Sequence, residues 1–168
     1  MANSRAARNS ELVYLARLQH QVFRPHEPSI QRYLSYVLED PTYRLDQTRV
    51  LEHSGEIVSH LRVWSRTLQL GCGPVRAGGI GSLLTLPHHR GKGYAELLLN
   101  ETEEYLKSEG YRLAFLFSAI GPVYYEQRGW HCVPLPQLRF ELMSFELNPP
   151  IARARVRPLC SGDLDRVA

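Results

Sequence analysis

The stretch Gly78–Asn100, GGIGSLLTLPHHRGKGYAELLLN, predicts the centre of the fold of this 168-residue chain. It begins with an apolar run from Ile80 to Leu86, which Pro87 ends and which is short enough for a buried strand. Helical spacing follows, in the series Ala95, Leu98, Leu99, Thr102, Tyr105 and Leu106. Gly110 then stands where a glycine ends a helix. The stretch therefore predicts a strand that enters a helix through a basic, glycine-rich turn.

The turn between them, Arg90 to Ala95, has the composition of an anion site. The first N–H groups of a helix have no acceptor within the helix, and the helix dipole places positive charge there. Gly91 and Gly93 let a phosphate approach the backbone, and Lys92 adds charge. A dinucleotide fingerprint is excluded because Tyr-Ala-Glu follows Gly93, and a P-loop is excluded because no Gly-Lys-Ser/Thr occurs.

Two motifs resemble those of one enzyme superfamily. Arg90-x-x-Gly93-x-Ala95 after a strand resembles the coenzyme A pyrophosphate loop of the GNAT N-acetyltransferases, Gln/Arg-x-x-Gly-x-Gly/Ala. The segment from Tyr125 to Trp130, YEQRGW, looks like the Tyr-x-x-x-Gly-Phe/Trp motif that closes GNAT domains, at the family's distance from the loop. The resemblance implies the GNAT acyl-CoA N-acyltransferase fold. This is an α/β (α+β) architecture with a mixed central sheet and helices on both faces.

Length and composition indicate a soluble globular protein. Hydrophobic residues make up 43% of the chain and charged residues 22%, and the length suits a single core. A net charge of +3 is too small to indicate nucleic acid, and no run reaches the ~18–20 apolar residues of a membrane helix. The first twelve residues lack the apolar core of a signal peptide. Cys72, Cys132 and Cys160, widely spaced, suit reduced thiols in a cytoplasm.

The pair His88-His89 does not indicate a metal site. Adjacent residues on a turn should point their rings apart. No cysteine or carboxylate stands at ligand spacing from them. We therefore expect no metal cofactor.

Further helices and strands are expected on both sides of this stretch. Amphipathic helices are predicted at Glu11–Val22, with Ser10 as N-cap, and at Ser29–Glu39, and a short helix between Gly121 and Gly129. The other predicted strands are Arg49–His53 and Ile57–Trp64 around a hairpin turn, a ribbon of Thr67–Leu70 and Val75–Ala77, Leu113–Phe117, His131–Val133 and Leu138–Phe145. Alternation in Ile57–Trp64 predicts one apolar face, and the wholly apolar Leu113–Phe117 predicts a parallel strand covered on both sides.

The domain boundary follows from a closer resemblance. The sequence is most similar to the enhanced-intracellular-survival type of GNAT, whose chains carry a Gly-Gly-Ile-Gly strand before the loop and a second acetyltransferase-like domain after it. Residues 1–150 are then the acetyltransferase domain. The tail, residues 151–168, looks like a GNAT domain's opening strand and first helix, so the natural chain is expected to continue. The alternative is a tail that packs back on the first domain as an extra strand.

The resemblance also assigns roles in binding. Backbone N–H groups of Arg90, Gly91, Lys92, Gly93, Tyr94 and Ala95 would hold the pyrophosphate. The backbone of Leu84 and Leu86 would pair with the pantetheine arm, with Thr85 between them in the same cofactor-binding segment, while the leucine side chains pack in the core. An amide N–H of this strand would polarise the thioester carbonyl, and Ser118 would line the opposite wall.

Tyr125 occupies the position of the family's general acid, which gives a proton to the departing thiolate. Tyr124 beside it is expected to be a core residue. The general base is left open, because Ile80–Leu86 contains no carboxylate. Glu56, His53 and His60 are candidates by chemistry alone, and a histidine on a strand is more often structural.

These features predict an N-acetyltransferase, an acyltransferase that moves an acetyl group from the cosubstrate acetyl-CoA to a primary amine. The competing class is a non-catalytic GNAT module that holds acyl-CoA or a partner protein. The missing base favours that alternative and Tyr125 opposes it. The amine would be a small molecule or a peptide, with no nucleic acid or membrane as partner. The identity of the amine and homo-oligomer formation stay open.

Overall fold

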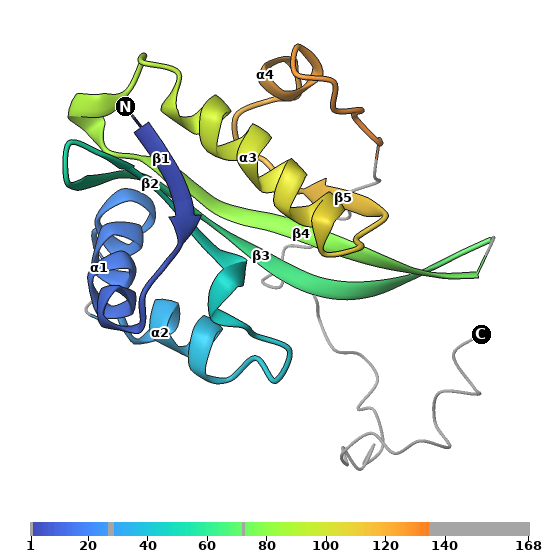
Figure 1. Ribbon diagram of the computed structural model, residues 1–168, viewed down its shortest axis with the longest axis horizontal. Coiled ribbons are helices and arrows are strands. Elements are labelled where there is room, and N and C mark those ends of the chain that lie inside the picture. Colours follow the sequence, from blue (N-terminus) through green and yellow to red (C-terminus); the bar gives the residue numbers. More distant parts are fainter. Residues whose placement is uncertain (1, 27–28, 72, 135–168) are drawn as a thin grey trace, which may run out of the picture. The chain divides into compact units, whose positions relative to one another are not determined.

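The computed structural model describes residues 2–26, 29–71 and 73–134. The chain forms two compact units, Met1–Gly121 and Pro122–Ala168. Within the described residues, the first unit holds a five-stranded sheet whose order follows the sequence (Figure 1). Its strands are β1 (Ala2–Ala6), β2 (Thr48–His53), β3 (Glu56–Leu70), β4 (Gly73–Thr85) and β5 (Leu113–Leu116). Adjacent strands are antiparallel except β4 and β5, which are parallel, so the expected mixed sheet is confirmed.

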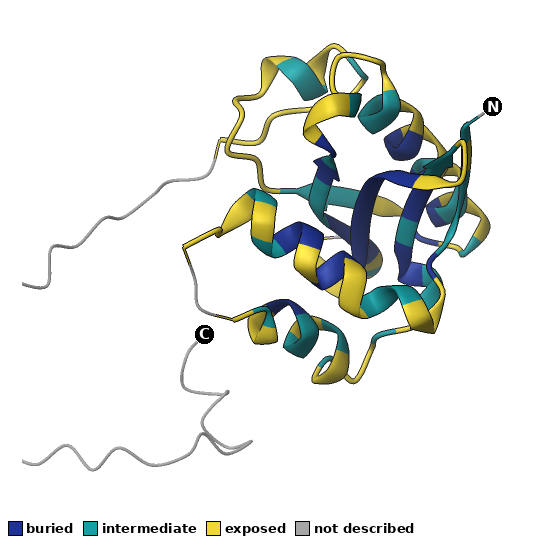
Figure 2. Ribbon diagram, turned by 90° about the vertical axis from the view of Figure 1, so that its left-hand side faces the viewer, coloured by how far each residue is buried: buried dark blue, intermediate teal, exposed yellow. Residues whose placement is uncertain are grey.

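Helices cover both faces of this sheet. Helices α1 (Leu12–Phe23) and α2 (Gln31–Leu38) lie on one face, and α3 (Tyr94–Ser108) crosses β2, β3 and β4 on the other (Figure 1). Buried residues are concentrated in the strands and on the helix faces that meet them (Figure 2). None of the helices in the described ranges combines the length and apolar character needed to cross a membrane.

The helix face predicted for α3 is confirmed. Leu98, Leu99, Thr102 and Leu106 are buried. The helix packs so closely on β4 that a Cβ placed on Gly78 would lie 2.6 Å from the Leu106 side chain. Gly110, with φ of +75°, ends the helix as expected. This close packing holds the last turns of α3 against the first half of β4.

Strand β3 differs from its prediction, because it is buried on both faces from Ile57 to Val63. It lies in the middle of the sheet with helices above and below. Neither face of the strand therefore meets solvent, and the alternation of polar and apolar residues does not indicate an exposed face. The polar side chains find partners instead. Ser59 Oγ donates to the Leu84 carbonyl at 2.7 Å, and the Arg62 guanidinium pairs with Asp40 at 3.0 Å.

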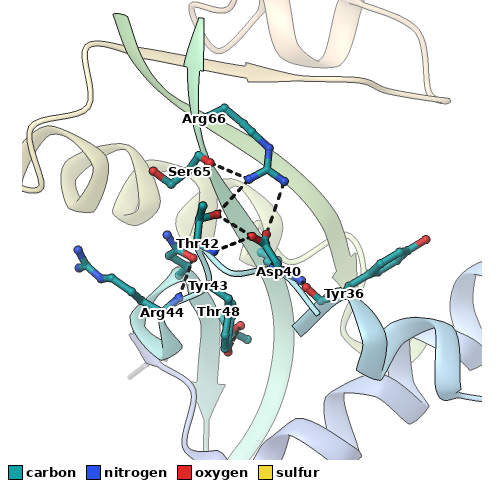
Figure 3. A network of polar contacts seen from close by, with 10 residues as sticks. Tyr36, Asp40, Thr42, Tyr43, Arg44, Thr48, Ser65 and Arg66 are labelled. Carbon is teal, nitrogen blue, oxygen red and sulfur yellow. Dashed lines mark hydrogen bonds and ion pairs between the residues drawn. The ribbon is translucent and has the colours of Figure 1, made fainter. Parts of the chain in front are cut away.

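Asp40 anchors the segment after α2 to β3. Its carboxylate accepts from the Thr42 amide at 2.9 Å and from the Thr42 hydroxyl at 2.7 Å, and Arg66 lies 3.5 Å away (Figure 3). Burial alone would raise the pKa of Asp40, but the Thr42 hydrogen bonds and the charges of Arg66 and Arg62 outweigh it and lower the pKa. Arg62 also lies over the Trp64 ring at 4.7 Å. These charged residues therefore have a structural role.

The N-terminal strand β1 was missed. Its sequence, ANSRA, has no apolar alternation, and its pairing with β2 is made by backbone groups. The Arg5 side chain adds ion pairs to Glu11 at 2.8 Å and to Glu52 at 2.7 Å. The predicted cap of the next helix is wrong, because Ser10 lies inside the 3₁₀ turn Asn9–Glu11 and Glu11 is the N-cap of α1.

Strand lengths were also underestimated. β3 and β4 form one long hairpin from Glu56 to Thr85, which absorbs the separate ribbon expected around Gly71. β5 pairs in parallel with β4 as predicted, but it is partly exposed, and Phe117 after it is 81% exposed. None of the residues from Leu113 to Leu116 is fully buried, so the prediction of a strand covered on both faces is wrong.

Less of the second unit is described. It contains α4 (Val123–Glu126), and Gly129 follows with φ of +82°. No strand forms at His131–Val133 in the described part, contrary to expectation. The predicted strand Leu138–Phe145 and the tail at 151–168 lie outside the described residues.

Candidate functional site

The glycine-rich turn lies directly before α3, as the sequence predicts. A 3₁₀ turn, η3 (Pro87–His89), leads from β4 into it. Gly91 and Gly93 both have left-handed φ angles, +74° and +78°, which L-residues adopt only at a cost. A Cβ at either glycine would meet no atom within 4 Å. The backbone conformation therefore requires the glycines, and the space above the turn is open.

The turn offers backbone donors and positive charge together. Gly93 is the N-cap of α3 and has no side chain to occupy the helix amides. The first intrahelical bond runs from Leu97 N to Gly93 O, so the amides of Tyr94 and Ala95 precede the hydrogen-bonded helix. The side chains of Arg90 and Lys92 are exposed. This arrangement suits a bound anion such as a phosphate.

An open strand edge adjoins the turn. β4 and β5 pair only from Ala77 with Leu113 to Ile80 with Leu116, and β4 alone continues to Thr85. The β4 backbone after Ile80 thus has a strand neighbour on its β3 side only, within the described residues. Ser118, two residues after β5, is exposed, and its Oγ accepts from the Ile120 amide at 3.1 Å.

A β-bulge interrupts β4 at this edge. Ser82 has φ of +54°, and Leu61 of β3 stands opposite two residues, Ser82 and Leu83. Such a bulge locally turns the direction of the backbone N–H groups. The sequence does not indicate this bulge, because a serine carries no strong preference for positive φ.

The register of β4 corrects which backbone groups face the open edge. The Leu86 amide donates to the Val58 carbonyl at 3.0 Å, so the backbone of Leu86, and by alternation that of Leu84, points toward β3. Both leucine side chains are buried, as expected. Thr85 faces the other way, and its carbonyl accepts from Arg90 Nε at 3.2 Å. Thr85 therefore presents its backbone to the open edge.

His60, a candidate base, is a structural residue. It is fully buried, with Nε2 2.8 Å from Gln19 Nε2 and Nδ1 3.2 Å from the Arg49 carbonyl. Burial lowers its pKa to about 4, so the ring is neutral at pH 7. Because the ring is buried and both of its nitrogens contact protein groups, it has no access to an incoming amine and does not serve as the general base.

The other two candidates, His53 and Glu56, lie near the turn. The His53 ring packs on Tyr94 at a centroid distance of 5.4 Å. Glu56, at the start of β3, accepts from His88 Nε2 at 3.3 Å and from His89 Nε2 at 3.0 Å. Hydrogen bonds from His89 foremost, and from His88, lower the pKa of Glu56.

The histidine pair also differs from its prediction. The rings of His88 and His89 lie 4.4 Å apart and both point toward Glu56. The expectation that the rings diverge is therefore wrong. The carboxylate comes from a strand more than 30 residues away in the sequence, so local spacing could not indicate it.

Tyr125 lies on α4 in the second unit, which is described by itself. Its ring packs edge to face with Tyr124 at 5.0 Å and with Trp130 at 6.3 Å. Arg128 stacks over the Tyr124 ring at 3.9 Å and donates to the Tyr124 carbonyl at 2.7 Å. Tyr124 and Tyr125 are both half-buried, so the expectation that Tyr124 is a core residue is wrong.

Comparisons with known proteins agree with the fold. The model of the family described as "Acetyltransferase (GNAT) domain" matches residues 3–133. No curated protein matches the sequence. Among solved structures, glucosamine-6-phosphate N-acetyltransferase from Arabidopsis thaliana superposes with a TM-score of 0.64 at 18% identity, covering 83% of this chain and 98% of that one.

Two further structures extend the comparison. A predicted acetyltransferase from Clostridium acetobutylicum, described with acetyl-CoA, gives a TM-score of 0.69 at 17% identity over 87% of this chain and 99% of that one. A GCN5-related N-acetyltransferase from Kribbella flavida gives 0.64 at 20% identity over 77% of this chain but only 32% of that one. At these identities the similarity establishes the fold.

Proposed function

The chain belongs to the GNAT acetyltransferase family and is an acyltransferase, and we propose that it moves an acetyl group from acetyl-CoA to a primary amine. The observation that carries this proposal is the open, glycine-rich turn before α3 beside the unpaired edge of β4. A diphosphate needs several backbone donors, and a pantetheine amide needs a strand edge. The first unit offers both within one short segment.

The turn would bind the pyrophosphate of CoA. The amides of Tyr94 and Ala95 precede the hydrogen-bonded helix at the positive end of α3, whereas the Arg90 amide already donates to the Pro87 carbonyl at 3.3 Å. Arg90 and Lys92 would add charge-assisted hydrogen bonds. No side chain stands in the way at Gly91 or Gly93.

The edge of β4 would bind the pantetheine arm. Thr85, whose backbone faces this edge, would pair with a pantetheine amide once Arg90 releases the Thr85 carbonyl. The bulge at Ser82 and Leu83 would direct an N–H toward the thioester carbonyl and stabilise the negative charge that develops there. Ser118 would line the opposite wall.

Tyr125 would complete the transfer. The neutral amine attacks the thioester carbonyl carbon, a C–N bond forms, and the C–S bond breaks. The departing thiolate takes the proton of the Tyr125 hydroxyl, and the proton lost by the amine returns to the protein through solvent. Because His60 is buried, we assign it no part in removing that proton.

The proposal also covers the GNAT type of the chain, its cellular location and the class of acceptor. The enhanced-intracellular-survival type is supported by the Gly-Gly-Ile-Gly of β4. A cytoplasmic location agrees with the three widely spaced cysteines. The acceptor would be a small-molecule or peptide amine, with no nucleic acid or membrane as partner.

The test is a transfer assay over a panel of aminoglycosides, polyamines, peptide N-termini and lysine peptides, with CoA release measured. Calorimetric binding of acetyl-CoA is measured separately on the same protein. We expect tight binding together with turnover on at least one amine class. Binding without turnover on any amine would contradict the enzymatic part of the proposal, and absence of binding would contradict the whole of it.

A further inference from the structure

We propose that Glu56, His88 and His89 form a binding site for a divalent transition-metal ion, with zinc the best fit. The carboxylate comes from the first residue of β3, and both imidazoles come from the turn η3. Figure 1 shows the hairpin turn between β2 and β3 beside the turn that precedes α3. One ligand atom from each of the three side chains can be chosen so that all lie within 4.8 Å of one another.

The distances match those of a metal site. Zinc binds histidine nitrogen and carboxylate oxygen at about 2.0–2.2 Å, so two ligand atoms on a tetrahedral ion are about 3.4 Å apart. Nε2 of His88 and Nε2 of His89 lie 3.3 Å and 3.0 Å from the two oxygens of Glu56. A metal ion would therefore replace two hydrogen-bonded protons with only a small displacement of the side chains.

The surrounding structure holds the ligands in place. The Leu86 amide is bonded to the Val58 carbonyl at 3.0 Å, which ties η3 to the first residues of β3. The His89 ring packs near Tyr94 at 5.9 Å and its side chain is only 13% exposed. Positioned ligands lose little conformational freedom on binding, which favours affinity.

The ligand chemistry selects the class of ion. Two imidazoles and one carboxylate suit zinc, nickel, cobalt or copper, whereas magnesium and calcium prefer oxygen ligands. Three protein ligands leave a fourth tetrahedral position for water. The side chains of His88 and Glu56 are 65% and 45% exposed, so an ion can reach the site from solvent.

The site is independent of the proposed acetyl transfer. A bound ion would cross-link the hairpin turn to the segment that leads into Arg90 and so stiffen the entry to the glycine-rich turn. It would also add positive charge close to that turn. Metal binding itself is the property to be measured, so the outcome does not depend on catalysis.

The experiment titrates tag-free, chelator-treated full chain with zinc and with nickel by calorimetry. We expect one high-affinity equivalent, and a loss of affinity of at least ~10-fold in each of Glu56→Gln, His88→Ala and His89→Ala. His26→Ala, an exposed histidine outside the cluster, is the matched control and should bind as the wild type does. Metal should also raise the melting temperature of the wild type but not of Glu56→Gln.

The absorption spectrum of bound cobalt distinguishes this site from a site with cysteine ligands. The cobalt complex should show tetrahedral absorption bands without a thiolate charge-transfer band, and Cys132→Ser should leave the spectrum unchanged. Circular dichroism shows whether each variant is folded. Because Glu56 and His88 are exposed, we expect their substitutions to leave the fold intact. Wild-type affinity in all three cluster variants, or no binding of zinc or nickel by the folded wild type, would overturn the proposal.

Discussion

Gly93→Glu is expected to abolish CoA binding. Gly93 is the N-cap of α3 with φ of +78°, and a side chain there would project into the open space above the turn. In the proposed complex that space holds the pyrophosphate, so the glutamate would collide with it and repel it by charge. Calorimetric titration with CoA should detect no binding.

Gly110→Glu is the matched control for this variant. Gly110 lies at the other end of the same helix, with φ of +75° and open space at its Cβ position. It incurs a similar backbone strain of about 1 kcal/mol, but it is remote from the proposed ligand. CoA affinity should be retained in Gly110→Glu. If Gly93→Glu bound CoA as tightly as Gly110→Glu does, the turn would not be the pyrophosphate site.

Tyr125→Phe should lower kcat by ~10²-fold or more while CoA affinity stays unchanged. The substitution removes only the hydroxyl, so the edge-to-face packing of the ring on Tyr124 and Trp130 is retained. Without the acid, the thiolate must leave unprotonated or take a proton from water. Initial rates at saturating acetyl-CoA and amine measure the effect.

Tyr124→Phe is the companion variant. The Tyr124 ring is held by Arg128, and the loss of its hydroxyl should leave kcat within a few-fold of the wild type. A drop confined to Tyr124→Phe, with Tyr125→Phe fully active, would transfer the acid role to Tyr124. Equal activity of both variants and the wild type would remove tyrosine from the proton transfer altogether.

Local sequence patterns were sufficient to predict the elements around the glycine-rich turn. The periodicity from Ala95 to Leu106 identifies the buried face of α3, and Gly110 marks its end, because these properties depend on spacing within one helix. The turn at Ser54 and Gly55 is likewise local, because Gly55, with φ of +81°, adopts the left-handed conformation without strain. The same local patterns predict that a turn and then a helix follow β4.

Features that depend on distant contacts could not be predicted. The burial of β3 on both faces follows from its central place in the sheet, and β1 is held by backbone pairing that its sequence does not reveal. The Glu56 cluster joins two turns more than 30 residues apart. Similarly, which of Leu84 and Thr85 faces the open edge depends on a register that shifts by one residue at the bulge.

A crystal structure of the chain with acetyl-CoA would show directly where the cofactor binds. We expect pyrophosphate oxygens within hydrogen-bond distance of the amides between Arg90 and Ala95, and the pantetheine arm alongside Thr85 on the open edge of β4. The Arg90 side chain, whose Nε lies 3.2 Å from the Thr85 carbonyl oxygen, should have left that oxygen. Acetyl-CoA bound elsewhere, or with its pyrophosphate away from the start of α3, would show that the glycine-rich turn is not the cofactor site.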